Sequence, residues 1–447
     1  MAGFPQGFVW GVAASAYQIE GAAGEGGRVP SVWDTFSHRP GTIADGQTGD
    51  VACDHVHRWR EDVALLADLG VDAYRLSVSW PRVVTASGAP NPAGLDFYDR
   101  LLDALVERGI TPVVNLFHWD LPQWLQDQGG WQQRDTAHRF AEYAAIVAAR
   151  LGDRVGVWAA INEMFEHFVL GHVVGEHAPG LQLPLSDAGT VAHHLLLAHG
   201  SAVATLRATG PTPIMAISSY APARPVSDSP ADVAAAAYYD TVQNRLFTDP
   251  ILLGSYPEEA LPLVEPAIRE GDMTVIASPV DLWGVNYYTV NAVRAVEGDI
   301  PLEVIPPAGL PVTAFGWAIA PDGLTEVLLG LHKRYGDRLP PLMVTENGCA
   351  VDDVVDAAGR CEDRERVSFL AAHLDAVQVA LDAGVDVRRF YVWSLLDNFE
   401  WAAGYTKRFG LVHVDYSTGR RTPKTSFGWL RERIRDSRTA SIGQSAR

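Results

Sequence analysis

The sequence of 447 residues has only three cysteines, Cys53, Cys349 and Cys361, and no C-x-x-C pair. This spacing argues against a disulfide framework or a structural zinc site; a Cys349–Cys361 contact is conceivable, but free thiols are favoured. No run of about 18 consecutive apolar residues occurs, so no transmembrane helix is predicted. The amino-terminal MAGFPQGFVWG lacks a basic region before an apolar run, so we expect no signal peptide and a cytoplasmic protein.

Basic residues are also scarce relative to acidic ones. There are 35 Lys and Arg against 54 Asp and Glu, a net charge of −19. Such a charge repels phosphate backbones and anionic lipid headgroups, so nucleic acid and membrane partners are not expected. The sequence contains no Walker loop and no G-x-S-x-G elbow, and its histidines lack the spacing of a zinc hydrolase. We therefore expect neither a metal nor a cofactor.

Eight apolar runs are present, and helical patterns separate them. Most runs are continuous Val, Ile, Leu and aromatic segments, as expected for strands buried on both faces of a parallel sheet. The predicted strands are Phe8–Ser15, Ala73–Trp80, Thr111–Phe117, Val155–Asn162, Pro213–Ser218, Leu282–Tyr288, Leu342–Thr345 and Phe390–Leu396. The predicted helices are Trp59–Leu69, Tyr98–Val106, Phe140–Leu151, Val191–Leu206, Ala231–Leu246, Leu324–Tyr335, Arg366–Leu381 and Pro423–Ile434. Eight β-then-α units predict a (β/α)8 TIM barrel in the α/β class.

Such a barrel needs about 250 residues, so the remaining length must lie in long βα-loops, mainly after the first, fifth and sixth strands. No low-complexity linker divides the chain, so we expect a single catalytic domain over residues 1–447. Pro222–Pro230 and Pro301–Pro311 are predicted surface loops, and residues 436–447 are expected to fray. A doubly wound open sheet is the alternative fold, but the Gly-rich phosphate turn typical of it is missing.

The reacting groups of a barrel enzyme lie at the carboxyl ends of its strands. Amides, carboxylates and indoles follow the predicted strands, and Glu163 and Glu346 follow the fourth and seventh. Indole faces stack on sugar rings, while amides and carboxylates bind hydroxyl groups. Two carboxylates about 5–5.5 Å apart would support retaining glycoside hydrolysis. A single Glu at a strand end is more often an ion-pair partner, so this interpretation depends on the whole set of residues.

Five motifs together resemble glycoside hydrolase family 1, the β-glucosidase family. They are FVWGVAASAYQIEGA (Phe8–Ala22), NLFHWDLPQWL (Asn115–Leu125), GVNYYT (Gly284–Thr289), VTENG (Val344–Gly348) and VWSLLDNFEWAAGYTKRFGLVHVDY (Val392–Tyr416). The resemblance extends from about Phe4 to Leu430. It implies a retaining exo-β-glycosidase that removes terminal β-D-glucosyl residues from small β-glucosides or short oligosaccharides, including those of cellulose degradation. It also implies activity on β-galactosides and β-fucosides, and no cofactor.

The resemblance also assigns roles to individual residues. Glu346 is the expected nucleophile, Glu163 the acid/base, and Arg75 with Tyr288 would keep Glu346 charged and oriented. Trp393 would lie beneath the sugar ring, and Trp317 would face the leaving group. The full set expected to bind substrate is Gln18, His118, Trp119, Asn162, Asn286, Tyr288, Trp317, Trp393, Glu400, Trp401 and Phe409.

Four positions refine this assignment. Glu400 would repel a phosphate, so a free 6-hydroxyl is expected on the sugar. The plant thioglucosidases have Gln at the position of Glu163, so Glu163 argues against that branch of the family. Met164 stands where the family has Pro, which removes a backbone restraint on Glu163. Glu166 is close to Glu163, but Glu163 is the preferred acid because Asn162 precedes it. A catalytically weak carbohydrate-binding barrel is therefore the alternative, while the natural leaving group, transglycosylation and oligomeric state stay open.

Overall fold

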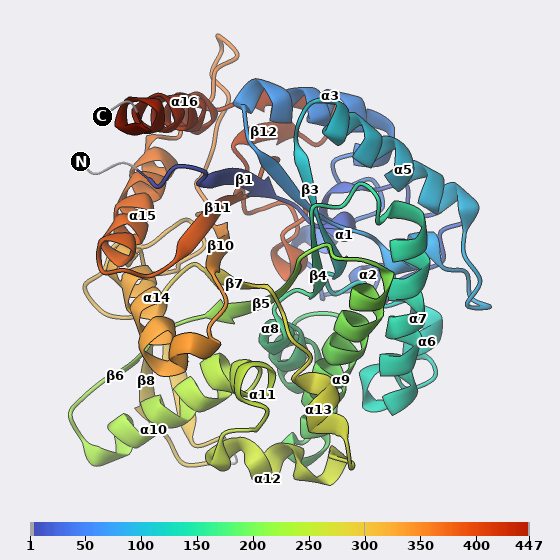
Figure 1. Cartoon of the computed structure of the whole chain (residues 1–447), viewed down its shortest axis with the longest axis vertical. Coiled ribbons are helices and arrows are strands. Elements are labelled where there is room, and N and C mark those ends of the chain that lie inside the picture. Colours follow the sequence, from blue (N-terminus) through green and yellow to red (C-terminus); the bar gives the residue numbers. More distant parts are fainter. Residues whose placement is uncertain (1–3, 299, 446–447) are drawn as a thin grey trace.

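A computed structural model describes residues 4–298 and 300–445. Within them, eight parallel strands close into a barrel in the order β1-β11-β10-β7-β5-β4-β3-β2, surrounded by helices (Figure 1). The barrel strands are β1 (Val9–Ala13), β2 (Ala73–Ser77), β3 (Thr111–Phe117), β4 (Val157–Ile161), β5 (Ile214–Tyr220), β7 (Leu282–Tyr287), β10 (Leu342–Asn347) and β11 (Val387–Trp393). The predicted (β/α)8 barrel is confirmed, and the open doubly wound sheet is wrong.

Each predicted helix corresponds to a helix in the structure. They are α3 (His55–Leu69), α5 (Pro92–Glu107), α7 (Arg134–Leu151), α9 (Leu185–Thr209), α10 (Pro230–Asp240), α14 (Pro321–Tyr335), α15 (Arg364–Asp382) and α16 (Thr425–Ser445). Proline in the first turn of α5, α10 and α14 suits a helix start, because its missing N–H has no partner there anyway. Residues 436–447 were expected to fray, but helix α16 continues as far as Ser445. Residues 446–447 lie outside the described chain.

Most of the extra length lies in the connections that follow the strands. The β1 connection carries α1 (Ala16–Ile19) and α2 (Val32–Ser37), and the β4 connection carries α8 (Met164–Phe168) and the π-helix η3 (Val169–Val174). After β5 come α10, the π-helix η4 (Thr241–Arg245), α11 (Thr248–Leu253), α12 (Leu261–Val264) and α13 (Asp272–Ile276). A hairpin of β12 (Val412–Asp415) and β13 (Arg420–Pro423) follows β11.

Two segments that we expected to be loops contain short strands. Pro222–Pro230 includes β6 (Ala223–Pro225), and Pro301–Pro311 includes β9 (Leu302–Ile305). Both pair with β8 (Asn291–Ala295) in a three-stranded sheet. Proline marked these segments as irregular, but it is tolerated in the edge strands of a sheet, and β6 and β9 are the two edges here.

The barrel interior is packed with side chains. One buried cluster consists of Ala73, Val113, Val157, Ala159, Met215, Ile217, Leu282, Met343 and Tyr391. The Tyr391 ring occupies the space that a Cβ on Gly11 would need, since such a Cβ would lie 2.3 Å from the ring. All three cysteines are buried and free. Among the described helices, none combines the length and apolar character needed to cross a bilayer.

Candidate active site

The strand ends bring the predicted catalytic residues to one mouth of the barrel. Asn162 and Glu163 follow β4 directly, Arg75 lies on β2, and Glu346 on β10 is in register with Asn286 on β7. Parallel strands present their carboxyl ends on the same side of a barrel. Neighbouring strands β7 and β10 thereby place Glu346 beside Asn286, whose amide binds Glu163.

Glu346 is held by a cation and a phenol. An Nη1 hydrogen of Arg75 donates to Glu346 Oε1, and the hydroxyl of Tyr288 donates to Oε2 at 2.7 Å. The other arm of the guanidinium donates from Nη2 to Asn162 Oδ1 at 2.6 Å. Arg75 and Glu346 are only 1% and 3% exposed, so water screens this pair weakly. An ionised, oriented carboxylate is what nucleophilic attack on a sugar carbon requires.

Glu163 is surrounded by amides instead. Its Oε1 accepts from Asn286 Nδ2 at 2.9 Å, and its Oε2 accepts from Asn162 Nδ2 at 3.3 Å. Burial, followed by the charges of Glu346 and Glu166, raises the pKa of Glu163 well above its usual value, and the Asn286 hydrogen bond opposes this in part. The neutral, protonated form of Glu163 is thereby favoured, as general acid catalysis requires.

Three of the predicted site residues have a left-handed backbone. The φ angles are 46° for Glu163, 78° for Trp119 and 47° for Trp401. Positive φ costs free energy for a residue with a side chain, and such residues cluster at functional sites.

A cluster of polar and aromatic side chains adjoins the two carboxyl groups. The His118 ring stacks with the rings of Trp393 and Trp401, at centroid distances of 5.8 and 5.9 Å. Gln18 accepts from Ser15 Oγ at 2.6 Å and donates to the carbonyl of Phe399 at 2.9 Å, which fixes its amide. Aromatic faces and fixed amides of this kind suit the faces and hydroxyl groups of a sugar.

Two buried polar atoms in this cluster are without a hydrogen-bond partner among the described residues: His118 Nδ1 and Glu400 Oε2. Burial and the positive charge of Arg75 hold the pKa of His118 well below its usual value, so the ring is neutral. Burial and the charge of Glu346 raise the pKa of Glu400 to about 8. Buried polar groups normally find partners, so these two atoms are suited to bind a ligand.

An aromatic cluster forms the other side of the mouth. Trp393 and Phe409 are buried with Ala13 and Ala350, and Tyr288, Phe315 and Trp317 pack against them. Trp317 stacks on Phe315 at 4.3 Å and lies 5.4 Å from the Tyr288 ring, measured between centroids. Trp317 is therefore linked through Tyr288 to the Glu346 carboxylate, and its role toward the leaving group stays a prediction.

Some polar residues at the strand ends have structural roles instead. Glu20 binds the guanidinium of Arg82 at 2.7 Å, and Asp397 binds Lys424 at 2.7 Å. Thr345 was not among the predicted site residues. It donates to Asn286 Oδ1 at 2.6 Å and so turns the Asn286 amide hydrogens toward Glu163. Its position next to Glu346 in the VTENG motif was the available signal.

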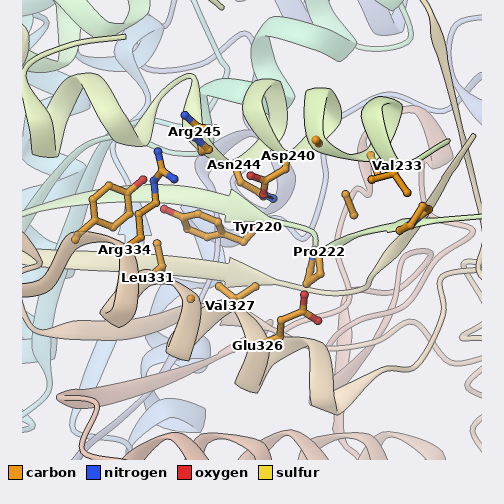
Figure 2. A pocket seen from close by; sticks show the side chains of 16 residues that line it. Tyr220, Pro222, Val233, Asp240, Asn244, Arg245, Glu326, Val327, Leu331 and Arg334 are labelled. Carbon is orange, nitrogen blue, oxygen red and sulfur yellow. Dashed lines mark hydrogen bonds between the residues drawn. The ribbon is translucent and has the colours of Figure 1, made fainter. Parts of the chain in front are cut away.

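A second hollow lies outside the barrel wall, between α10 and α14 (Figure 2). It has a volume of about 560 Å³, and its walls include Tyr220, Asp240, Asn244, Arg245 and Arg334. Both arginines bind Asp249, and Arg245 also lies 3.9 Å from Glu259. None of the predicted site residues is among those that line this hollow. Within the described chain, no group of three or more His, Cys, Asp or Glu is placed to hold a metal ion.

Comparison with known proteins identifies the family. The model of glycosyl hydrolase family 1 matches residues 1–439. The chain is 44% identical over 463 positions to a bifunctional β-D-glucosidase/β-D-fucosidase of Bifidobacterium breve, covering 97% of this chain and 98% of that protein. It is 48% identical to the thermostable β-glucosidase B of Thermobispora bispora, covering 97% and 90% of the two chains. The solved structure of a Thermotoga maritima β-glucosidase in complex with glucoimidazole matches with a TM-score of 0.93, 42% identity and coverage of 97% and 99%. The chain belongs to glycosyl hydrolase family 1.

Proposed function

We propose that this member of glycosyl hydrolase family 1 is a retaining exo-β-glycosidase that removes terminal β-D-glucosyl residues through a covalent intermediate. The observation that supports this most directly is the different surroundings of the two carboxyl groups. Glu346 meets the cation of Arg75, whereas Glu163 meets the amides of Asn162 and Asn286. Environments that favour ionisation of one carboxyl group and protonation of the other define a nucleophile and an acid.

The reaction then proceeds in two displacements. An oxygen of Glu346 attacks the anomeric carbon, the bond to the leaving oxygen breaks, and the proton of Glu163 passes to that oxygen. The resulting glycosyl ester is uncharged, so Glu163 loses the nearby negative charge that raised its pKa. Glu163 can then take a proton from water, which attacks the anomeric carbon and releases Glu346 and the sugar with its original configuration.

We infer a sugar with a free 6-hydroxyl. Glu400 supplies a buried oxygen without a partner, which suits a sugar hydroxyl group. The ionised form of Glu400, which predominates above its pKa of about 8, would repel a phosphate. The relative from Bifidobacterium breve is named for both glucosidase and fucosidase action, which supports acceptance of β-fucosides here. Galactosides differ from glucosides at one hydroxyl group and are included in the proposal on the same pocket of Gln18, His118 and Glu400.

The test is release of nitrophenol from a panel of β-glycosides with glucosyl, galactosyl, fucosyl and 6-phosphoglucosyl groups. Turnover of the glucoside by the wild-type enzyme and its loss in Glu346→Gln are expected, and nuclear magnetic resonance of the first sugar released should show the β-anomer. Folded protein that binds glucose analogues but releases no nitrophenol would favour the catalytically weak binding barrel. Release of the α-anomer would refute the retaining mechanism.

A matched variant assigns the acid/base. Glu163→Gln should turn over nitrophenyl glucoside far better than cellobiose, because nitrophenolate leaves without a proton whereas a sugar alkoxide does not. Proton donation of this kind contributes about 10²–10⁴-fold to rate. Glu166→Gln is the comparison, because Glu166 is the neighbouring carboxyl group on α8, and its loss on cellobiose should be far smaller than that of Glu163→Gln. If Glu166→Gln shows the larger loss on cellobiose, Glu166 rather than Glu163 is the acid.

A further inference from the structure

Glu166 is a third carboxyl group near the catalytic pair, and the mechanism above does not use it. It lies in the first turn of α8, three residues after Glu163. Its Oε1 accepts from Ser219 Oγ at 3.1 Å and from Gln243 Nε2 at 3.4 Å. These partners lie on β5 and η4, so three separate elements fix the position of this carboxyl group.

A hydrogen-bond relay orients the amide that faces Glu166. Asn291 Nδ2 donates to Tyr239 Oη at 2.8 Å, and the Tyr239 hydroxyl donates to Gln243 Oε1 at 3.1 Å. With its oxygen occupied in this way, Gln243 must present its NH2 group to Ser219 and Glu166. These hydrogen bonds therefore hold the Glu166 carboxyl group in one position.

The partners of Glu166 are all uncharged. Within the described part of the chain, no Lys, Arg or His forms an ion pair with it, and its Oε2 accepts no hydrogen bond from the protein. Glu166 is partly exposed, so Oε2 is accessible from outside. The charged groups that it faces are Glu163, at the start of its own helix, and the ionisable hydroxyl of Tyr239 on α10. Burial raises the pKa of Glu166, and the hydrogen bonds from Gln243 and Ser219 oppose this in part. Both interactions are repulsive when the groups are ionised, so the ionised Glu166 carboxylate is a negative charge that no cation compensates.

We propose that Glu166 determines leaving-group specificity by placing an uncompensated carboxylate beside the acid/base Glu163. The inference rests on the proposed function, because the oxygen that leaves must approach Glu163 to receive its proton. Whatever that oxygen carries then lies within the field of Glu166. The carboxylate repels an anionic leaving group, attracts a cationic one and accepts hydrogen bonds at Oε2 from an uncharged, hydroxylated one.

The experiment compares leaving groups of equal shape and different charge. The substrates are 4-carboxyphenyl, 4-carbamoylphenyl and 4-(aminomethyl)phenyl β-glucosides, and the quantity is the ratio of kcat/KM values for one enzyme at one pH. The protonation state of Glu163 affects numerator and denominator alike, so it cancels. In Glu166→Gln, the carboxyphenyl to carbamoylphenyl ratio should rise about 5- to 10-fold, as expected for a partly screened charge pair. The aminomethylphenyl to carbamoylphenyl ratio should fall by a similar factor.

Two controls separate this effect from a change of overall charge or fold. Glu432→Gln removes one negative charge from an exposed position on α16 and should leave both ratios unchanged. Raising the salt concentration should shift the wild-type ratios in the same directions as Glu166→Gln does, because the Debye length falls to about 3 Å at 1 M. This second measurement requires no variant and therefore does not depend on the folding of one.

The possible outcomes distinguish the inference from the function on which it rests. Normal turnover of the carbamoylphenyl glucoside with ratios that do not respond to Glu166→Gln or to salt overturns the role of Glu166 and leaves the glycosidase intact. A wild-type enzyme that hydrolyses none of the three glucosides overturns both. Equal shifts in Glu432→Gln and Glu166→Gln would mean that net charge, and not this site, sets the preference, and would also refute the inference.

Discussion

Arg75 is the residue on which the difference between the two carboxyl groups depends most directly. Replacing it with Met keeps the length of the side chain but removes both donors, one to Glu346 and one to Asn162. Glu346, which is 3% exposed, then retains only the Tyr288 hydroxyl as a donor. Removing one partner of a buried ion pair costs about 3–5 kcal/mol. If the reactive form of Glu346 bears that cost, kcat/KM falls by about 10²–10³-fold or more.

Arg75→Lys separates charge from geometry. Lysine keeps the cation, but its ammonium cannot reproduce the planar fork that joins Glu346 to Asn162. We expect it to lose about tenfold in kcat/KM, equivalent to one charge-assisted hydrogen bond of about 1.5 kcal/mol. The assay is hydrolysis of 4-nitrophenyl β-glucoside, with urea unfolding of each variant to measure stability.

The control is Arg388→Met, which removes an exposed arginine at the start of β11 that pairs with Asp386. It should leave kcat/KM within about twofold, since exposed ion pairs contribute about 0–1 kcal/mol. The reasoning is refuted if folded Arg75→Met retains more than a third of the wild-type kcat/KM. Equal losses in Arg75→Lys and Arg75→Met would show that geometry, and not charge, is what Glu346 requires.

Three further changes test separate parts of the structure. Asn286→Ala removes a hydrogen bond that lowers the pKa of Glu163, so Glu163 should stay protonated to higher pH. The alkaline limb of the pH profile of kcat/KM should therefore move to higher pH, and a shift to lower pH would contradict this. Lys424→Met leaves two buried aspartates, Asp353 and Asp397, without the ammonium that they share. The free energy of unfolding, measured in urea, should fall by about 3–5 kcal/mol. The control Lys333→Met, at an exposed position, should change it by less than about 0.5 kcal/mol. Met164→Pro should raise the ratio of kcat/KM for an aryl glucoside to that for cellobiose by about tenfold. Proline disfavours a left-handed conformation in the residue before it and so would move the backbone of Glu163. Equal ratios in the variant and the wild type would show that this restraint does not matter.

The barrel strands were predictable because strands buried on both faces need uninterrupted apolar runs. The eighth strand shows the limit of that rule. It was expected at Phe390–Leu396 but spans Val387–Trp393, because the polar side chains of Arg388 and Arg389 interrupt the run and hid its beginning. The end differs because Leu396 instead forms a bridge with Val412, beyond the barrel. Helix starts were missed for a similar reason: the first turn of α3, at His55, is polar and adds nothing to the apolar stripe.

Candidate site residues were predictable where a motif carries them. The structure adds contacts of long sequence separation that no local pattern contains. Glu166 meets Ser219 and Gln243 from 53 and 77 residues away, and Arg75 meets Glu346 from 271 residues away. The sequence shows that these residues exist, but the closure of the barrel decides which of them become partners. The strands β6 and β9 also escaped prediction, because each depends on a partner strand for its conformation.

The contacts of Asn162 explain how one mouth of a barrel can hold two carboxyl groups in different surroundings. Its Oδ1 accepts from Arg75, so its Nδ2 must face the other way, toward Glu163 and His118. Arg75, which binds Glu346, thus also fixes the Asn162 amide that contacts Glu163. One hydrogen-bond network therefore sets the surroundings of both carboxyl groups. Because the Glu163 pKa depends on the charge of Glu346, formation of the glycosyl ester changes the proton affinity of Glu163 without any movement of the protein. In the proposed mechanism, the exchange of acid for base is then a consequence of the chemistry at Glu346.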